Sequence, residues 1–376
     1  MEYNILSKKI RNILVLILTI FCFFRIKYFA ALHAYMFLLI FILYFIINIT
    51  KIEFKISFFT IYSIIYFSLN SLIFYFFSSK EIEESLLEYV IYFIFPVLYY
   101  NTVIELASNM KQKDILKYIN FINNILIIFL IFELIIRIKN VIFTFNNEGV
   151  IKSYLQLKRN SFVFSDTNFL ALFIQNILYL NLYLYKKFRD IIYKKYSICY
   201  IVFILLTFSR SVIITTFIIY YLYNIMNMLK SKKYILFILF NMFSVCLLFI
   251  LYNILSNDNS LQSKIEIIKG LEYYKNVNIE NQLFGFGFKK GEYIYSYIKG
   301  GYAHLHIALL LGQIGVIGLA LYIIYIIVLY YKTKRKSKYL LIAFFISGFS
   351  LAFFDSSFYY VLAIISVLEN KNIKGF

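Results

Sequence analysis

The stretch Ser197–Leu229 decides the fold. It reads SICYIVFILLTFSRSVIITTFIIYYLYNIMNML and carries a single charged residue, Arg210. As one α-helix these 33 residues would be about 50 Å long, at ~1.5 Å per residue, whereas the apolar core of a bilayer is about 30 Å thick. Two full crossings would need about 40 residues. The stretch therefore predicts a short helical hairpin, with helices at 197–209 and 212–229 and a tip slightly below the outer membrane surface.

The whole chain has the same membrane character. It is 376 residues long, 62% hydrophobic and only 15% charged, with one Pro, no Trp and a mean hydropathy of +0.77. Soluble domains are typically about 45–50% apolar and about 25% charged. The composition therefore excludes a soluble enzyme, a disordered chain and a disulfide-rich secreted module, and it predicts an all-α polytopic membrane protein.

Apolar runs predict about 12 transmembrane helices. The first run, 13–24, resembles the apolar core of a signal peptide, but Arg25 and Lys27 stand where a cleavage site would be, so we expect it to remain as an anchor. Reading 13–49 as one span gives 11 crossings and moves only the N-terminus. The other expected spans are 28–49, 56–77, 88–107, 119–136, 168–185, 197–209, 212–229, 234–255, 307–331, 339–354 and 358–368.

Charge predicts the orientation. The chain has 38 Lys and Arg against 19 Asp and Glu, a net charge of +19. The cations concentrate in short connections, notably 186–195, 230–233 and 332–338, which the positive-inside rule places in the cytoplasm together with both termini. No basic block with interleaved aromatic residues lies outside the apolar segments, so nucleic acid is not an expected partner. The cations instead set topology and contact anionic membrane lipid.

Two larger extracytoplasmic loops, 137–167 and 256–303, are long and polar, and irregular backbone of this kind must lie above the membrane or cap a cavity. They divide the chain into an N-terminal transmembrane bundle (1–136), a catalytic membrane region (137–331) and a C-terminal transmembrane hairpin (332–376). The second loop also predicts an amphipathic surface helix, from a cap at Ser260 and the spacing of Leu261, Ile265 and Ile268.

Arginines near the outer surface are the first candidate site residues. Arg210 lies at the hairpin tip, and an arginine at that depth costs about a few kcal/mol unless it is paired. The alternative is a side chain that extends to lipid headgroups. The same two interpretations apply to Arg159 and its neighbour Lys158, just before the next span. Guanidinium groups bind phosphate oxygens bidentately, so such arginines suit a lipid-linked diphosphate.

Histidine supplies the candidate base. His304 and His306 stand where the second large loop returns to the membrane, and imidazole can accept a proton near neutral pH. His33 lies inside an apolar span and is expected to be structural. The two loop histidines would face different directions on a helix, all three cysteines lie in apolar runs, and no acidic cluster adds ligands. No metal and no cofactor are therefore expected.

Carboxylates offer alternatives for a base or a sugar ligand, and no spacing singles one of them out. Glu133 lies four residues before Arg137, which is the spacing of a helical ion pair. The external carboxylates are Asp166, Glu280, Glu292 and Asp355.

Four short motifs, in this order along the chain, together resemble the O-antigen ligase/polymerase superfamily. Residues 166–168 (DTN) look like its "dpN" motif, and 206–211 (LTFSRS) resemble its "T-x-SR" hairpin tip. Residues 282–287 (QLFGFG), followed by His304 and by 312–318 (GQIGVIG), are similar to its "plfGxG … HN … G-x-x-G" block at the end of the large outer loop.

The resemblance covers roughly residues 158–330 and implies a metal-independent glycosyltransferase that acts on polyprenyl-diphosphate-linked glycans in the bacterial plasma (inner) membrane. By motif, Arg210 would hold the diphosphate and His304 would act as the base. His304 is preferred over His306 because it precedes Gly315 by eleven residues, the spacing expected of the family.

Two positions depart from the family pattern. Leu305 follows the histidine where the family has asparagine, and the large loop contains no arginine, so the second phosphate contact falls to Arg159 or to a loop lysine. Glycines at 285, 287, 300 and 301 would let the loop backbone pass close to a bulky glycan. The candidate substrate-binding residues are Lys158, Arg159, Asp166, Asn168, Lys289, Lys290 and His306.

The favoured function is a polymerase that joins lipid-linked oligosaccharide repeat units into O-antigen, capsule or exopolysaccharide, with a flippase and a chain-length regulator as partners. One alternative is a ligase that transfers finished glycan to another acceptor. Alternatives of other classes are a polysaccharide flippase or secondary transporter and a non-enzymatic scaffold. Transporters usually place ionisable groups near the midplane of related halves, whereas the polar residues here concentrate in two unlike outer loops, which favours an enzyme.

Overall fold

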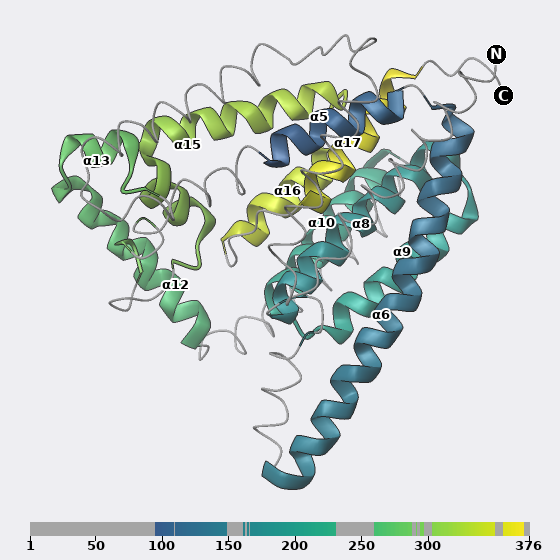
Figure 1. Ribbon diagram of the computed structural model, residues 1–376, viewed down its shortest axis with the longest axis horizontal. Coiled ribbons are helices and arrows are strands. Elements are labelled where there is room, and N and C mark those ends of the chain that lie inside the picture. The colour runs from purple at the N-terminus through teal and green to yellow at the C-terminus, as the bar shows by residue number, and fades with distance from the viewer. Residues whose placement is uncertain are drawn as a thin grey trace, which may run out of the picture.

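The computed structural model describes residues 95–108, 110–148, 161, 164, 166–230, 259–287, 291, 294–296, 303–349 and 356–371. This part of the chain is helical and contains no strand, which confirms the all-α prediction (Figure 1). Within it, three helices are long and apolar enough to cross a membrane: Gln112–Ile142, Thr167–Phe188 and His306–Lys332. The described helices thus support a membrane protein. The spans expected before residue 88 and at 234–255 lie outside the described residues, and the count of about 12 stays a prediction.

Each predicted span that falls on described residues coincides, at least in part, with a helix. The helices of the bundle are α5 (Phe95–Ser108), α6 (Gln112–Glu148), α8 (Thr167–Phe188), α9 (Ile191–Leu206), α10 (Arg210–Lys230), α15 (His306–Lys332), α16 (Lys338–Gly348) and α17 (Ser356–Asn370). The second large loop contains α12 (Asn259–Gly270), the 3-10 helix η3 (Leu271–Asn276) and α13 (Ile279–Phe284). Figure 1 shows α12 and α13 to one side, next to the start of α15.

Helix α8 is the central helix of the bundle. In its most apolar window 78% of the residues are buried, against 33% in α6. Polar side chains tie the neighbours of α8 to it: Asn123 of α6 and Asn181 of α8 exchange side-chain hydrogen bonds of 2.9 and 3.0 Å. Tyr200 of α9 donates to Asn123 Oδ1 at 2.8 Å. Such buried bonds fix the register of α6, α8 and α9, because helices in a membrane gain little from apolar contact alone.

The helices gather the cations at one end of the bundle, which we call the basic end: residues 107–111, 186–190, 332–338 and 368–371. The Lys187 ammonium lies 2.8 Å from Glu369 Oε1, and Lys371 Nζ donates to the Ala107 carbonyl at 2.9 Å. Lys334 Nζ donates to the Glu369 carbonyl. Two basic connections that the sequence assigns to one side of the membrane therefore meet in space.

The predicted hairpin is present. Helices α9 and α10 are joined by the turn 207–209, in which Phe208 has a left-handed φ of 55° and Ser209 N donates to Thr207 Oγ1 at 3.2 Å. Helix α9 begins at Ile191 rather than at the predicted residue 197. Asp190 caps it by accepting from Ile192 N, and Lys194 and Lys195 point outward, so these cations do not interrupt the helix.

The boundary predicted between 136 and 137 is not a helix end. Helix α6 continues to Glu148, so the first part of the expected external loop 137–167 is helical. A cation usually marks the end of a span, but the Arg137 side chain is buried and paired within the helix to Glu133, with Nε 3.5 Å from Oε1. This confirms the predicted ion pair and explains why the helix does not stop.

Helix α15 is broken at Gly315, whose φ of 64° and ψ of −171° are not helical. The ring of His306 consequently lies 5.8 Å from that of Tyr322. In a straight helix sixteen residues would separate them by about 24 Å. The expected span 307–331 is therefore a short segment followed, after a sharp bend, by a longer one that runs to the basic end.

Candidate functional site

The end opposite the basic end, where α8, α10 and α15 begin, contains the candidate site, and we call it the site end. Asp166 caps α8: its Oδ1 accepts from Asn168 N at 2.9 Å and its Oδ2 accepts from Asn168 Nδ2 at 3.0 Å. A cap of this kind contributes about 1 kcal/mol to helix stability. Asp166 and Asn168, predicted as substrate ligands, thus also have a local role in starting α8.

His304 lies two residues before α15 and is exposed. Its pKa is lowered from the usual 6.5, first because nearby protein atoms displace water and second because Lys264 of α12 is close, while Asp166 opposes the shift. A lowered pKa keeps the imidazole neutral near pH 7 and able to accept a proton. The structure thus brings a histidine, a carboxylate and an ammonium group from three separate elements into one electrostatic cluster.

Arg210 is the first residue of α10 and is exposed at the same end. Helices α8 and α10 run parallel, since Gln175 Nε2 donates to Thr216 Oγ1 at 3.0 Å and lies 3.4 Å from the Val212 carbonyl. Gln175 is about 13 Å along α8 from Asp166, and its acceptors Val212 and Thr216 are about 3 and 9 Å along α10 from Arg210, so Arg210 lies about 5–10 Å deeper than Asp166.

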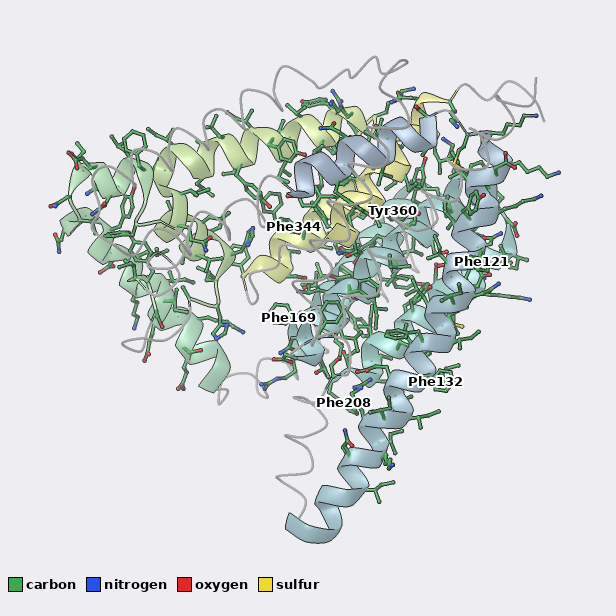
Figure 2. The ribbon with its side chains drawn as sticks, in the orientation of Figure 1. Phe121, Phe132, Phe169, Phe208, Phe344 and Tyr360 are labelled. Carbon is green, nitrogen blue, oxygen red and sulfur yellow. The ribbon has the colours of Figure 1, made fainter. Side chains whose placement is uncertain are left out.

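The hairpin tip lies short of the end of α6. Figure 2 shows Phe169, at the start of α8, and Phe208, in the tip, at one end of the bundle, and Figure 1 shows α6 extending well beyond them. The depth of the tip relative to a membrane surface stays a prediction.

Arg137 is a residue that sequence reasoning paired but did not assign to the site. Its side chain is 2% exposed, and its Nη1 donates to the Leu206 carbonyl at 3.1 Å. Leu206 ends α9, where carbonyls lack helical partners and a cation is favourable. The Glu133–Arg137 pair therefore holds the end of α9 from which the Arg210 turn starts, and the i, i+4 spacing was the available signal.

The two glycine motifs of the large loop and α15 fold against each other, backbone to backbone. Phe286 N donates to the Gly312 carbonyl at 2.7 Å, and a Cβ on Gly285 would lie 2.6 Å from Gln313 backbone atoms. A Cβ on Gly315 would lie 2.4 Å from the Leu283 carbonyl oxygen. The expectation that Gly285 leaves room for a glycan is wrong, because that space holds the protein's own backbone.

His306 also needs a correction. It is 4% exposed, and its ring packs 5.3 Å from Phe344 and 5.8 Å from Tyr322 in edge contacts. The predicted role as a substrate ligand at the outer surface is therefore wrong, because the first residue of α15 turns inward. The amphipathic helix predicted in the second loop is present as α12: Ile267 packs against the loop, and the stripe residues Ile265 and Ile268 are exposed, so they do not pack on the described part of the protein.

Of the remaining candidates, the structure describes one and leaves the others outside the described residues. Glu280 is exposed on α13. Among the residues that the structure describes, no group of three or more His, Cys, Asp or Glu side chains could hold a metal ion. The candidates that lie outside the described residues are Lys158, Arg159, Lys289, Lys290, Glu292 and Asp355.

Comparisons with known proteins identify no family: no family model, no curated protein and no solved structure matches the chain.

Proposed function

We propose that this protein is a polymerase that joins polyprenyl-diphosphate-linked oligosaccharide repeat units into a cell-surface polysaccharide. The reaction would occur on the outer face of a bacterial plasma membrane, with both termini in the cytoplasm. The observation that carries the proposal is the His304 cluster, with Asp166 and Lys264, at the same end of an apolar helical bundle as Arg210. The motif resemblance supplies the substrate class.

The proposed chemistry is a direct displacement at a sugar. An acceptor hydroxyl oxygen attacks the anomeric carbon of the donor, His304 takes the hydroxyl proton, and the bond from that carbon to the diphosphate oxygen breaks. The electron pair leaves with the polyprenyl diphosphate. Arg210 stabilises the negative charge that grows on the leaving group, which lowers the barrier only to the extent that the contact strengthens in the transition state.

Lys264 and Asp166 would have opposite effects on the base. Before reaction, Lys264 disfavours the imidazolium and helps to keep His304 unprotonated. After proton transfer, the Asp166 carboxylate stabilises the imidazolium that has formed. A base needs both properties, because its pKa must lie near the working pH for proton transfer to be efficient.

The test replaces the chromosomal gene with variants and resolves surface glycan by chain length on gels. His304→Gln removes a general base, an effect of about 10²–10⁴ in rate, and Arg210→Gln removes an electrostatic contact, an effect of about 10²–10³. Both variants should lose long chains and accumulate single repeat units while remaining in the membrane fraction. The matched control is Lys195→Gln, an exposed residue of α9 distant from the site end, which should retain long chains.

Normal chain lengths in both site variants would overturn the proposal. If long glycan is made but is not transferred to its final acceptor, the protein is the ligase instead.

A further inference from the structure

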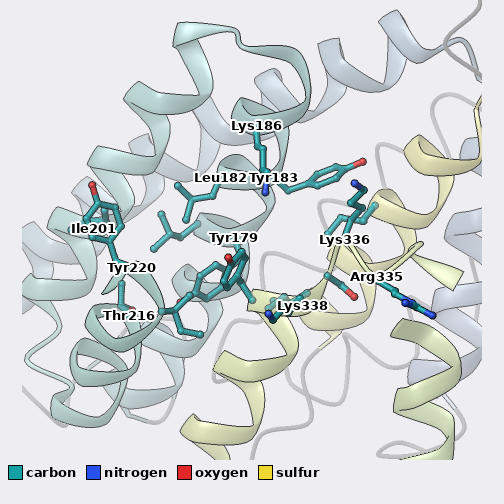
Figure 3. Close-up of a pocket in the computed structure, with 16 residues that line it drawn as sticks. Tyr179, Leu182, Tyr183, Lys186, Ile201, Thr216, Tyr220, Arg335, Lys336 and Lys338 are labelled. Atoms are coloured by element: carbon teal, nitrogen blue, oxygen red, sulfur yellow. The ribbon is translucent and has the colours of Figure 1, made fainter. Parts of the chain in front are cut away.

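A pocket opens at the basic end, between α8, α10 and the turn that joins α15 to α16 (Figure 3). Its volume is about 240 Å³. Four cationic residues line it, Lys186 from α8 and Arg335, Lys336 and Lys338 from the turn and the start of α16. The Arg335 guanidinium points away from the pocket, over the Tyr331 ring at 5.2 Å, so the other three supply its cationic groups (Figure 3). Among the described residues, the lining contains no acidic side chain.

The acidic groups nearby have other partners. Glu369 Oε1 accepts from Lys187 Nζ at 2.8 Å and from the Tyr183 hydroxyl at 2.6 Å. The Asp190 carboxylate accepts from Ile192 N at 3.0 Å and caps α9. Although Lys336 also interacts electrostatically with Glu369, one carboxylate cannot balance this group of cations. The pocket therefore has the electrostatic character of an anion site.

Hydrogen bonds fix the backbone of the turn 333–337 and so keep its cationic residues close together. Lys334 and Arg335 have left-handed φ values of 48° and 62°, and their backbone amides donate to the carbonyls of Tyr331 and Tyr330 at 2.9 and 3.1 Å. The Thr333 and Ser337 hydroxyls lie 2.7 Å apart and close the turn. Few residues other than glycine adopt this backbone, so the turn concentrates like charges at a cost in strain.

Aliphatic and aromatic side chains make up most of the remaining lining. Leu178 and Leu182 of α8 and Ile219 of α10 form part of its wall, and Tyr220 is 49% exposed at its border. Phe217, three residues earlier on α10, is 50% exposed, so an apolar path leads away from the cations along this helix. A ligand that fills both parts carries an anionic group next to an apolar chain.

We infer that this pocket binds the headgroup of an anionic glycerophospholipid from the leaflet that covers the basic end, with an acyl chain against α10. Basic pockets between membrane helices recognise such headgroups, whereas inorganic phosphate would use the cations but not the apolar wall. The inference does not depend on the proposed reaction, since the pocket lies at the end opposite His304.

The experiment measures lipid binding to the full-length protein in detergent by native mass spectrometry. The probes are phosphatidylglycerol, phosphatidylcholine and inorganic phosphate. The double variant Lys186→Gln/Lys338→Gln should bind phosphatidylglycerol about 30-fold more weakly than the parent, from two cation contacts of ordinary strength. The matched control is Lys194→Gln/Lys195→Gln, which removes two exposed cations of α9 outside the pocket and should change affinity less than about twofold.

A second variant, Lys186→Arg/Lys338→Arg, keeps the charge and should retain most of the affinity, which separates loss of charge from misfolding. Equal losses in the pocket and control variants would reject the pocket in favour of a general surface effect. Equal binding of phosphatidylcholine, or competition by inorganic phosphate at the same concentration as lipid, would also overturn the inference.

Discussion

The charged side chains at the two ends of the bundle are paired in different ways. At the basic end, many cations share Glu369 and backbone carbonyls, and several remain exposed. Among the described residues of the site end, Arg137 is paired with Glu133 and the Leu206 carbonyl, and His304 feels the opposing charges of Asp166 and Lys264. This difference fits the proposal that the cations of the basic end set topology and that the paired groups of the site end serve the reaction.

The largest expected contrast comes from one ion pair at each end. Arg137→Met should lower the free energy of unfolding by about 3–5 kcal/mol, because Glu133 is left charged, buried and without its cation. Lys187→Met should cost less, about 1 kcal/mol, because Glu369 keeps the hydrogen bond from the Tyr183 hydroxyl and its electrostatic interaction with Lys336. Thermal unfolding in detergent measures both.

The double variant Glu133→Gln/Arg137→Met sharpens this test. It should restore much of the free energy of unfolding that Arg137→Met loses, because no unpaired charge is then buried at this site. Equal effects of Arg137→Met and Lys187→Met would remove the distinction between the two ends.

A smaller effect is expected from the glycine contact at the site end. Gly315→Ala should destabilise the fold by about 3 kcal/mol, because its φ of 64° is unfavourable with a Cβ and the added atom meets the Leu283 carbonyl. Gly270→Ala is the matched control, since Gly270 has φ −60° and no heavy atom within 4 Å of an added Cβ. If both alanine variants unfold at the same temperature, the backbone contact does not hold α15 in its bent form.

The smallest effect is a shift in pH dependence. Lys264→Gln removes a cation beside His304, so the pKa of His304 rises and the acid limb of glycan elongation moves to higher pH. Asp166→Asn acts in the opposite direction. Lys269→Gln, an exposed change on the same helix, leaves the limb in place. The measurement is the elongation rate between pH 5 and 8. If neither Lys264→Gln nor Asp166→Asn moves the acid limb of this profile, His304 is not the base.

The same pKa has a consequence for stability. In the unfolded chain His304 has its usual pKa of about 6.5, so it binds a proton at a higher pH than in the folded protein. The free energy of unfolding therefore decreases as the pH falls below about 6.5. Lys264→Gln should therefore reduce the acid sensitivity of unfolding as well as shift the rate profile.

Within the described residues, the sequence predicted helix positions correctly wherever the length of the apolar run was enough to locate the helix. The hairpin in Ser197–Leu229 is the clearest example, since run length and membrane thickness leave few alternatives. Boundaries failed where a cation lies inside a helix. Arg137 and Lys194 were read as loop residues, but the first is neutralised by Glu133 and the second faces outward.

The sequence predicted which residues belong to the candidate site, but not which of them lie next to one another. His304 and Arg210 were selected by their chemistry and motifs, and both lie at the site end. His306 was misplaced because spacing alone does not show which histidine faces the core. The proximity of Asp166 to His304 and the bond from Arg137 to Leu206 join residues from separate helices or loops, so no local pattern could predict them.

The amino-acid sequence by itself determined that this is a helical membrane protein and which connections carry its cations, because apolar transfer and net charge depend on local composition. Only the tertiary structure decided which charges meet, where α15 bends and which glycines touch. Those outcomes depend on distances between segments that are remote along the chain, and packing sets these distances.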